Sequence, residues 1–142
     1  SKVAGVPVAS SCLMQVPWVQ SLLPPNTRVG ILTISNSQLI ADQLKILGMP
    51  SNSPIIGMDP KGAFARAVIH DEIKLDVDQS RAEIVFAAGL LCSQNPNIRA
   101  LVLECTNMAP YTADVSEALN LPVFDFYSFI TWFQAGLCPR RF

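Results

Sequence analysis

The 142-residue sequence has few charged residues and few residues that bind metals. Charged residues make up 15% of the chain and the formal net charge is −1, so no strong field attracts phosphates or anionic lipids. The single histidine, His70, and the lack of a Cys-x-x-Cys pair argue against a zinc site. We therefore expect no metal, no nucleic acid and no membrane surface as a partner.

Long hydrophobic runs and targeting signals are also lacking. Charged residues and prolines interrupt each apolar stretch before it reaches the length of a membrane-spanning helix. The start of the chain has none of the charged and apolar regions of a secretory signal. These absences predict a soluble, cytoplasmic protein whose cysteines are reduced thiols: Cys12, Cys92, Cys105 and Cys138.

Hydrophobic residues, in contrast, are abundant: they make up 50% of the chain, enough for one compact domain. Apolar runs of strand length alternate with segments in which apolar residues recur at helical spacing. Prolines, glycines and capping residues separate these segments. We expect strands at 6–9, 28–33, 54–57, 98–104 and 122–124, and helices at 13–23, 39–47, 63–69, 76–94, 112–119 and 129–137.

This alternation, with strands that are apolar on both faces, predicts an α/β fold. The expected architecture is a parallel sheet of about four to five strands flanked by helices on both faces. In such sheets, ligands bind at the carboxyl ends of the strands. The polar residues expected at these ends are Ser10, Ser11, Thr33, Ser35, Cys105, Thr106, Asn107 and Asp125.

The strand predicted at 98–104 leads directly into a thiol, a hydroxyl and an amide, in Cys105, Thr106 and Asn107. Backbone N–H groups of the loop and the start of a following helix favour the ionised form of such a thiol. We therefore predict that Cys105 is a catalytic acid/base and that Thr106 and Asn107 donate hydrogen bonds to a substrate carboxylate. The alternative is an inert thiol in the core.

The phrase Glu104-Cys105-Thr106-Asn107-Met108, followed by Pro110-Tyr111, resembles the aspartate/glutamate (Asp/Glu/hydantoin) racemase superfamily. Further stretches resemble that family, so that the resemblance covers nearly the whole chain: 6–23, 24–25, 29–33 and 121–136.

The resemblance implies two similar α/β halves that face each other across a cleft, with one cysteine from each half on opposite sides of the substrate α-carbon. It implies an isomerase, a cofactor-independent amino-acid racemase that uses no pyridoxal phosphate and no metal. Hydrogen bonds to the carboxylate and exclusion of water would then stabilise the carbanion. Cys105 would be the second cysteine, and the positions that hold the substrate correspond to Thr106 and Thr33, with Ser10, Ser11 and Asn107 as further candidates.

The same resemblance implies a domain division. Residues 1–26 would be the last strand and helix of an otherwise missing N-terminal half, and residues 27–142 the C-terminal α/β domain. The cysteine that opposes Cys105 would lie in the missing half. Cys12 follows a predicted strand, but its position is usually apolar in the family, so we interpret it as structural, like Cys92 and Cys138.

Two other functions stay open. One is a decarboxylase or cis-trans isomerase of a dicarboxylic acid on the same scaffold. The other is a non-catalytic carboxylate-binding module in which Cys105 is a neutral, buried thiol. In each case the ligand is a small-molecule carboxylate or amino acid. The chain is expected to form a homo-oligomer or to pack with the missing half. A set of aromatic residues is expected to be packing surface, in the second case against that half: Phe126, Tyr127, Phe129, Trp132 and Phe133.

The remaining polar residues have structural interpretations. His70 is expected to be a solvated helix residue. Thr33 and Ser35 could equally cap a helix. Glu104 and Asp125 are placed outside the site, since backbone amides could satisfy both carboxylates.

Overall fold

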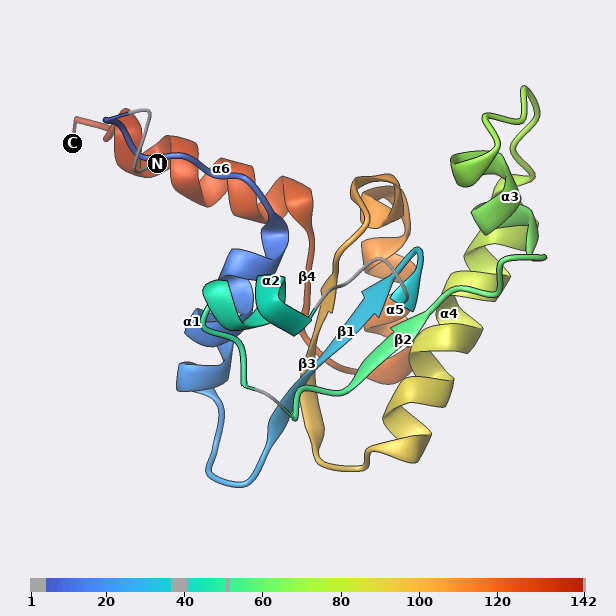
Figure 1. The fold of residues 1–142 in the computed structure, drawn as a ribbon, viewed down its shortest axis with the longest axis horizontal. Helices are drawn as coiled ribbons and strands as arrows, with labels where there is room; N and C mark the ends of the chain where they lie inside the picture. The colour runs from blue at the N-terminus through green and yellow to red at the C-terminus, as the bar shows by residue number, and fades with distance from the viewer. Residues whose placement is uncertain (1–4, 37–40, 51, 142) are drawn as a thin grey trace.

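The computed structural model of the chain describes residues 5–36, 41–50 and 52–141. Within them, four strands form one parallel sheet in the order β2-β1-β3-β4 (Figure 1). The central strands are β1 (Arg28–Thr33) and β3 (Ile98–Leu103), and the edge strands are β2 (Ile55–Gly57) and β4 (Val123–Phe124). This sheet is the parallel α/β architecture that the sequence predicts.

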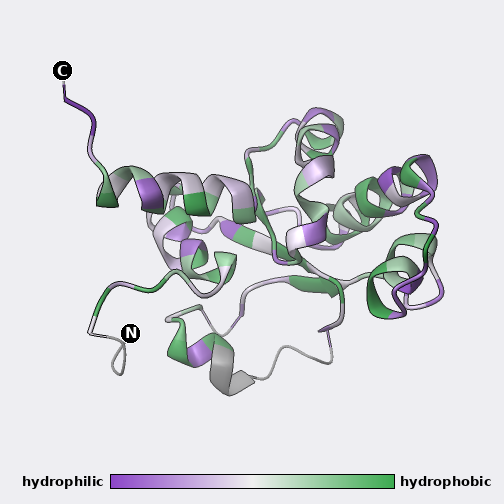
Figure 2. Cartoon of the chain, turned by 90° about the horizontal axis from the view of Figure 1, so that it is seen from above, coloured by the Kyte–Doolittle hydropathy of each residue, from purple (hydrophilic) through white to green (hydrophobic). Residues whose placement is uncertain are grey.

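Helices cover both faces of the sheet. The α-helices are α1 (Gln15–Leu22), α2 (Ala41–Ile46), α3 (Ala63–Ile69), α4 (Val77–Gln94), α5 (Thr112–Leu119) and α6 (Phe126–Leu137). Two 3-10 helices, η1 (Cys12–Met14) and η3 (Thr106–Tyr111), precede α1 and α5. Figures 1 and 2 show α3, α4 and α5 on one side of the strands and α1, α2 and α6 on the other.

The two central strands form the middle of the core because their side chains are buried on both faces. Leu32 and Leu101 pack with residues of α3, α4 and α5 in one cluster. Ile31 and Val102, their neighbours along the chain, pack with residues of η1, α1 and α6 in the other. Successive residues of a strand point to opposite faces, so a strand covered on both sides must be apolar throughout.

Helix boundaries follow the capping residues. The sequence predicts that either Asp76 or Asp78 starts α4, and it is Asp76 that caps the helix by accepting a hydrogen bond from the N–H of Gln79. The last helix, α6, starts three residues earlier than the predicted start at 129. Asp125 and Ser128 cap it reciprocally: the N–H of Ser128 donates to Asp125 Oδ1 at 2.7 Å, and the N–H of Asp125 donates to Ser128 Oγ at 2.9 Å.

Two parts of the predicted secondary structure differ from the observed fold. Residues 6–9 form no strand and belong to no sheet, and Val6 and Val8 are exposed, so the predicted strand there is wrong. A short apolar run becomes a strand only if a neighbouring strand supplies hydrogen bonds. The 3-10 helix η3 lies where the sequence predicts only a loop between the strand and the next helix. The start of the predicted helix 39–47 lies outside the described residues.

The segment before β1 packs on the sheet that follows it. Cys12, Leu13, Val16 and Val19 are buried in the same cluster as Val29 of β1. The assignment of residues 1–26 to a separate half stays a prediction.

The last helix carries several of the aromatic residues. Phe129 is buried in the core, whereas Tyr127 and Trp132 are largely exposed. Trp132 stacks on Trp18 of α1, with ring centroids 5.8 Å apart and planes at 23°. This contact attaches α6 to α1. In the described part of the chain, no helix has both the length and the apolar character needed to cross a membrane.

Gly30 provides a test of the packing on the face of the sheet that α3, α4 and α5 cover. A Cβ at this position would lie 2.8 Å from side-chain atoms of Ile98 and Leu101 and 3.1 Å from Leu91. We expect Gly30→Ala to lower the free energy of unfolding by about 1–3 kcal/mol, measured by urea denaturation. Gly136→Ala in α6 is the control, because a Cβ there meets no atom within 4 Å. Equal unfolding midpoints for the two variants would contradict the packing described.

Candidate active site at the carboxyl edge of the sheet

The residues that follow β1 and β3 meet at the carboxyl edge of the sheet. The hydroxyl of Thr33 donates to Glu104 Oε2 at 2.9 Å, and the backbone N–H of Glu104 donates to the carbonyl of Leu32 at 2.8 Å. Thr33 is only 1% exposed, while Glu104 is half-buried. This pair of contacts fixes the Glu104 carboxylate next to Cys105.

Cys12 joins the same edge from the other end of the chain. Its thiol lies 3.2 Å from the carbonyl oxygens of both Leu103 and Glu104 and donates toward them. Burial, followed by the negative charges of Glu104 and Asp125, raises the pKa of the Cys12 thiol to about 12. Cys12 is therefore protonated at neutral pH, and its role at the edge is structural, as interpreted from the sequence.

Asp125 lies at the end of β4 and closes the edge on that side. Its carboxylate accepts hydrogen bonds from the hydroxyl of Thr112, at 2.7 Å, and from the N–H of Ser128. Its carbonyl accepts one from the side-chain amide of Gln15, at 3.0 Å. The Asp125 side chain is 6% exposed and fully engaged within the protein, so it is a structural residue of the edge.

Cys105 lies two residues after the end of β3 and is the N-cap residue of η3. Its side chain is half-buried. Desolvation raises the pKa of the thiol, and the charge of Glu104 raises it further. The backbone N–H groups of Asn107 and Met108 act in the opposite direction, as expected from the sequence, but they do not outweigh burial. The thiol is a weak acid, and its thiolate is a correspondingly strong base.

Thr106 and Asn107 are both exposed at the start of η3. They line a cavity of about 360 Å³ whose other wall comes from α3 and the segment after it. The structure therefore places these two predicted substrate-binding residues at an accessible cavity beside Cys105. A contact between either residue and a substrate stays a prediction.

The other predicted binding residues have partners within the protein. The Thr33 hydroxyl is used by Glu104, and Thr33 Oγ1 accepts the N–H of Ser35 at 3.4 Å. Ser11 caps η1 by accepting the N–H of Leu13 at 3.2 Å. Ser10 is exposed, and its hydroxyl lies 3.7 Å from the sulfur of Met14. None of these contacts tests a substrate-binding role, and for all three residues that role stays a prediction.

The position of Glu104 differs from the predicted one. The sequence predicts that backbone amides satisfy this carboxylate outside the site. In the structure it accepts the hydroxyl of Thr33, and its charge raises the pKa of both Cys105 and Cys12. Because Glu104 directly precedes Cys105 in the sequence, an effect of its charge on that thiol could have been predicted. The contact with Cys12 could not be inferred, because 92 positions separate Cys12 from Glu104.

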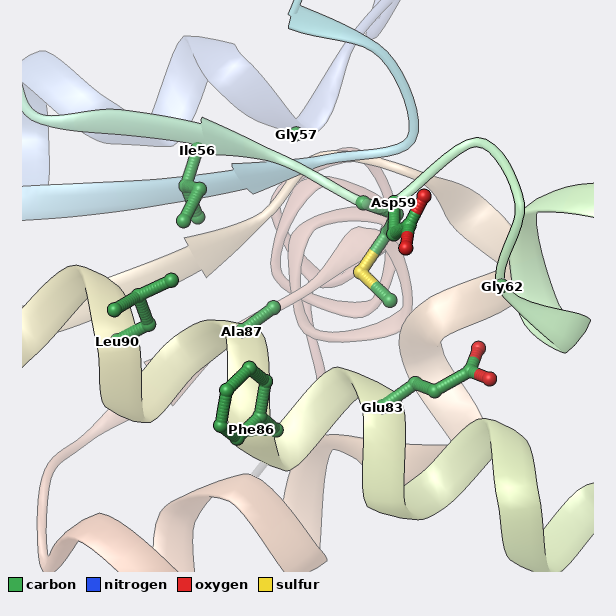
Figure 3. A pocket seen from close by; sticks show the side chains of 9 residues that line it. Ile56, Gly57, Asp59, Gly62, Glu83, Phe86, Ala87 and Leu90 are labelled. Atoms are coloured by element: carbon green, nitrogen blue, oxygen red, sulfur yellow. The ribbon is translucent and has the colours of Figure 1, made fainter.

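A second cavity, of about 320 Å³, lies between β2 and α4 (Figure 3). Ile56 points from β2 toward Ala87 and Leu90 of α4, and the carboxylates of Asp59 and Glu83 lie at the end of the cavity. None of the predicted site residues lines it, so it is separate from the edge that carries Cys105.

Potential metal ligands are scattered. Among the residues that the structure describes, no group of three or more histidine, cysteine, aspartate or glutamate side chains could hold a metal ion. All four cysteines are free thiols.

Several lyases are similar to this sequence. It is 26% identical over 125 residues to a dimethylsulfoniopropionate lyase of Durusdinium sp. clade D, across 84% of this chain and 41% of that protein. It is 28% identical over 145 residues to dimethylsulfoniopropionate lyase 7 of Emiliania huxleyi (strain CCMP1516), across 95% of this chain and 42% of that protein. The chain thus spans about two fifths of the length of these relatives, and both are enzymes.

Among solved structures, allantoin racemase from Pseudomonas fluorescens has a similar fold. The TM-score is 0.60, with 16% sequence identity, over 88% of this chain and 50% of that chain. A likeness at this identity concerns the fold, and it confirms the predicted α/β architecture. No protein-family model matches the sequence.

These comparisons correct the predicted function. The prediction of an amino-acid racemase is wrong, because the curated relatives are lyases. The prediction of an enzyme is supported, but the isomerase class is not.

The pKa and burial of Cys12 predict its reactivity. In the native protein, iodoacetamide should label the exposed Cys138 first and Cys12 on the order of a hundredfold or more slowly, because alkylation requires an accessible thiolate. Mass spectrometry of the labelled peptides measures both rates, and labelling in urea shows that Cys12 reacts once unfolded. Native labelling of Cys12 as fast as that of Cys138 would show that its thiol is not enclosed.

Proposed function

We propose that this chain carries the proton-abstracting part of a lyase that acts on dimethylsulfoniopropionate, with Cys105 as the base. The observation that carries the proposal is the half-buried Cys105 thiol at the carboxyl edge of the sheet, beside the accessible residues Thr106 and Asn107. The similarity to dimethylsulfoniopropionate lyases supports it, and one of those alignments covers 95% of the chain.

The chemistry is an elimination. The substrate has a carboxylate at one end and a positively charged sulfonium two carbons away. The Cys105 thiolate takes a proton from the carbon next to the carboxylate, and that C–H electron pair forms the new double bond. The carbon–sulfur bond breaks, and its electron pair leaves with dimethyl sulfide. The products are acrylate and dimethyl sulfide, and the proton on Cys105 passes to solvent.

The raised pKa of Cys105 suits this role. A hydrogen next to a carboxylate is a very weak acid, so a thiolate with a high pKa removes it more readily than one with a low pKa. The cost is that a smaller fraction of the thiol is ionised at neutral pH. Thr106, Asn107 and the N–H groups of η3 would hold the carboxylate and offset the charge that develops on it.

Replacing Cys105 tests the proposal. In the complete protein, Cys105→Ser should reduce release of dimethyl sulfide by about 10²- to 10⁴-fold, the usual contribution of a positioned acid/base, as measured by gas chromatography. Cys138→Ser is the matched control, because this cysteine is exposed and far along α6 from the edge, and it should keep its activity. Activity that survives in Cys105→Ser would refute the proposal.

The pH dependence gives a second test. Since activity follows the thiolate and the pKa of Cys105 is raised, the rate should still increase above pH 9.0, the ordinary value for the thiol. Glu104→Gln removes a charge that opposes ionisation, so it should move this rise to lower pH while the Thr33 hydroxyl keeps an acceptor. A profile that is flat above pH 7, or identical in the two proteins, would count against Cys105 as the base.

A further inference from the structure

The cavity beside the Cys105 segment combines features that suit a positively charged methylated group. Thr106 and Asn107, the two residues after Cys105, form one wall, and residues of α3 and the loop that follows it form the other. Its volume of about 360 Å³ falls in the range of small-molecule sites.

Two buried aromatic rings lie at the base of this cavity. Phe64 and Tyr111 both line it, and they contact each other edge to face, with centroids 6.0 Å apart and planes at 89°. Both side chains are almost entirely buried, so their positions are fixed by the core. Because these rings are buried, the accessible apolar wall of the cavity comes from Val68, Leu75 and Pro110, and such a wall suits the methyl groups of an onium ion.

Carboxylates complete the lining on the loop after α3. Asp71 has no hydrogen bond or ion pair with any other described residue, while Glu72 is paired with Arg66 at 3.3 Å. Asp71 therefore leaves one uncompensated negative charge at the cavity. Its backbone is left-handed, with φ +51°, a conformation that asparagine and aspartate tolerate better than most residues.

Helix α4 fixes the position of α3, which forms one wall of the cavity. Glu83 of α4 accepts the N–H groups of Ala63 and Phe64, each at 3.0 Å, and so holds the start of α3. Because Phe64 is part of this contact and also lines the cavity, the start of α3 at the cavity is held against α4.

We infer that this cavity binds the onium group of the substrate, a methylated sulfonium or quaternary ammonium, through the carboxylate of Asp71 and the apolar wall formed by Val68, Leu75 and Pro110. The substrate carboxylate then extends toward the start of η3 and Cys105. This inference rests on the proposed function for the identity of the substrate, but it is a statement about binding and is tested without turnover.

Two ligands of the same shape, one charged and one neutral, measure the contribution of the positive charge to binding. In 3-(trimethylammonio)propionate, nitrogen replaces the sulfonium and is a poor leaving group, whereas 4,4-dimethylpentanoate has the same shape with a neutral carbon. In the complete protein, calorimetry should give a Kd about five- to tenfold lower for the charged probe. Asp71→Asn should bring the ratio of the two Kd values close to one, and Asp59→Asn, which changes an exposed carboxylate at the other cavity, should leave the ratio unchanged.

Outcomes for binding and for turnover separate the two proposals. Cys105→Ser should keep the preference for the charged probe while losing turnover, and Asp71→Asn should raise KM for dimethylsulfoniopropionate with little change in kcat. Equal Kd values for the two probes in the unmodified protein would overturn the onium site, whatever Cys105 does. If Asp71→Asn fails to fold, Asp71→Gly removes the same charge at a left-handed position that glycine tolerates, and an unchanged probe ratio in that variant would also count against the site.

Discussion

The pairing of β1 with β3, buried on both faces, determines where the helices and the candidate site lie. It sets the spacing of the two helical layers and brings the ends of the two strands to the same height. Thr33 and Glu104 can form a hydrogen bond only because their strands run in parallel and end together. The location of Cys105 follows from that pairing, since it is the residue after Glu104.

Much of this framework could be predicted because it depends on local patterns. The strand at 28–33 has the predicted ends, and α3 and α5 match their predicted ranges, since apolar periodicity and caps are encoded within a few residues. The prediction of a strand at 6–9 was wrong because a strand requires a neighbouring strand as its partner, and a local pattern cannot reveal that partner. The contact of Cys12 with the end of β3 is long-range and left no local signal.

The two cysteines at the edge show how burial separates similar groups. Cys12 is enclosed and donates to two carbonyls, so its thiol is held in the protonated form. Cys105 is less buried and is exposed to opposing influences from two backbone N–H groups and from Glu104. The sequence suggested that the N–H groups would dominate, but the balance between hydration and hydrogen bonding depends on the packed structure and is not a property of the motif.

The stacking of Trp18 on Trp132 has a spectroscopic consequence. These are the two tryptophans of the chain, and both lie at the contact between α1 and α6. Intrinsic emission at tryptophan wavelengths therefore reports whether α6 stays attached to α1, and it carries little information about events around Cys105. Near-ultraviolet circular dichroism should be dominated by the same ring pair, so loss of that signal would mark detachment of the last helix before the sheet itself unfolds.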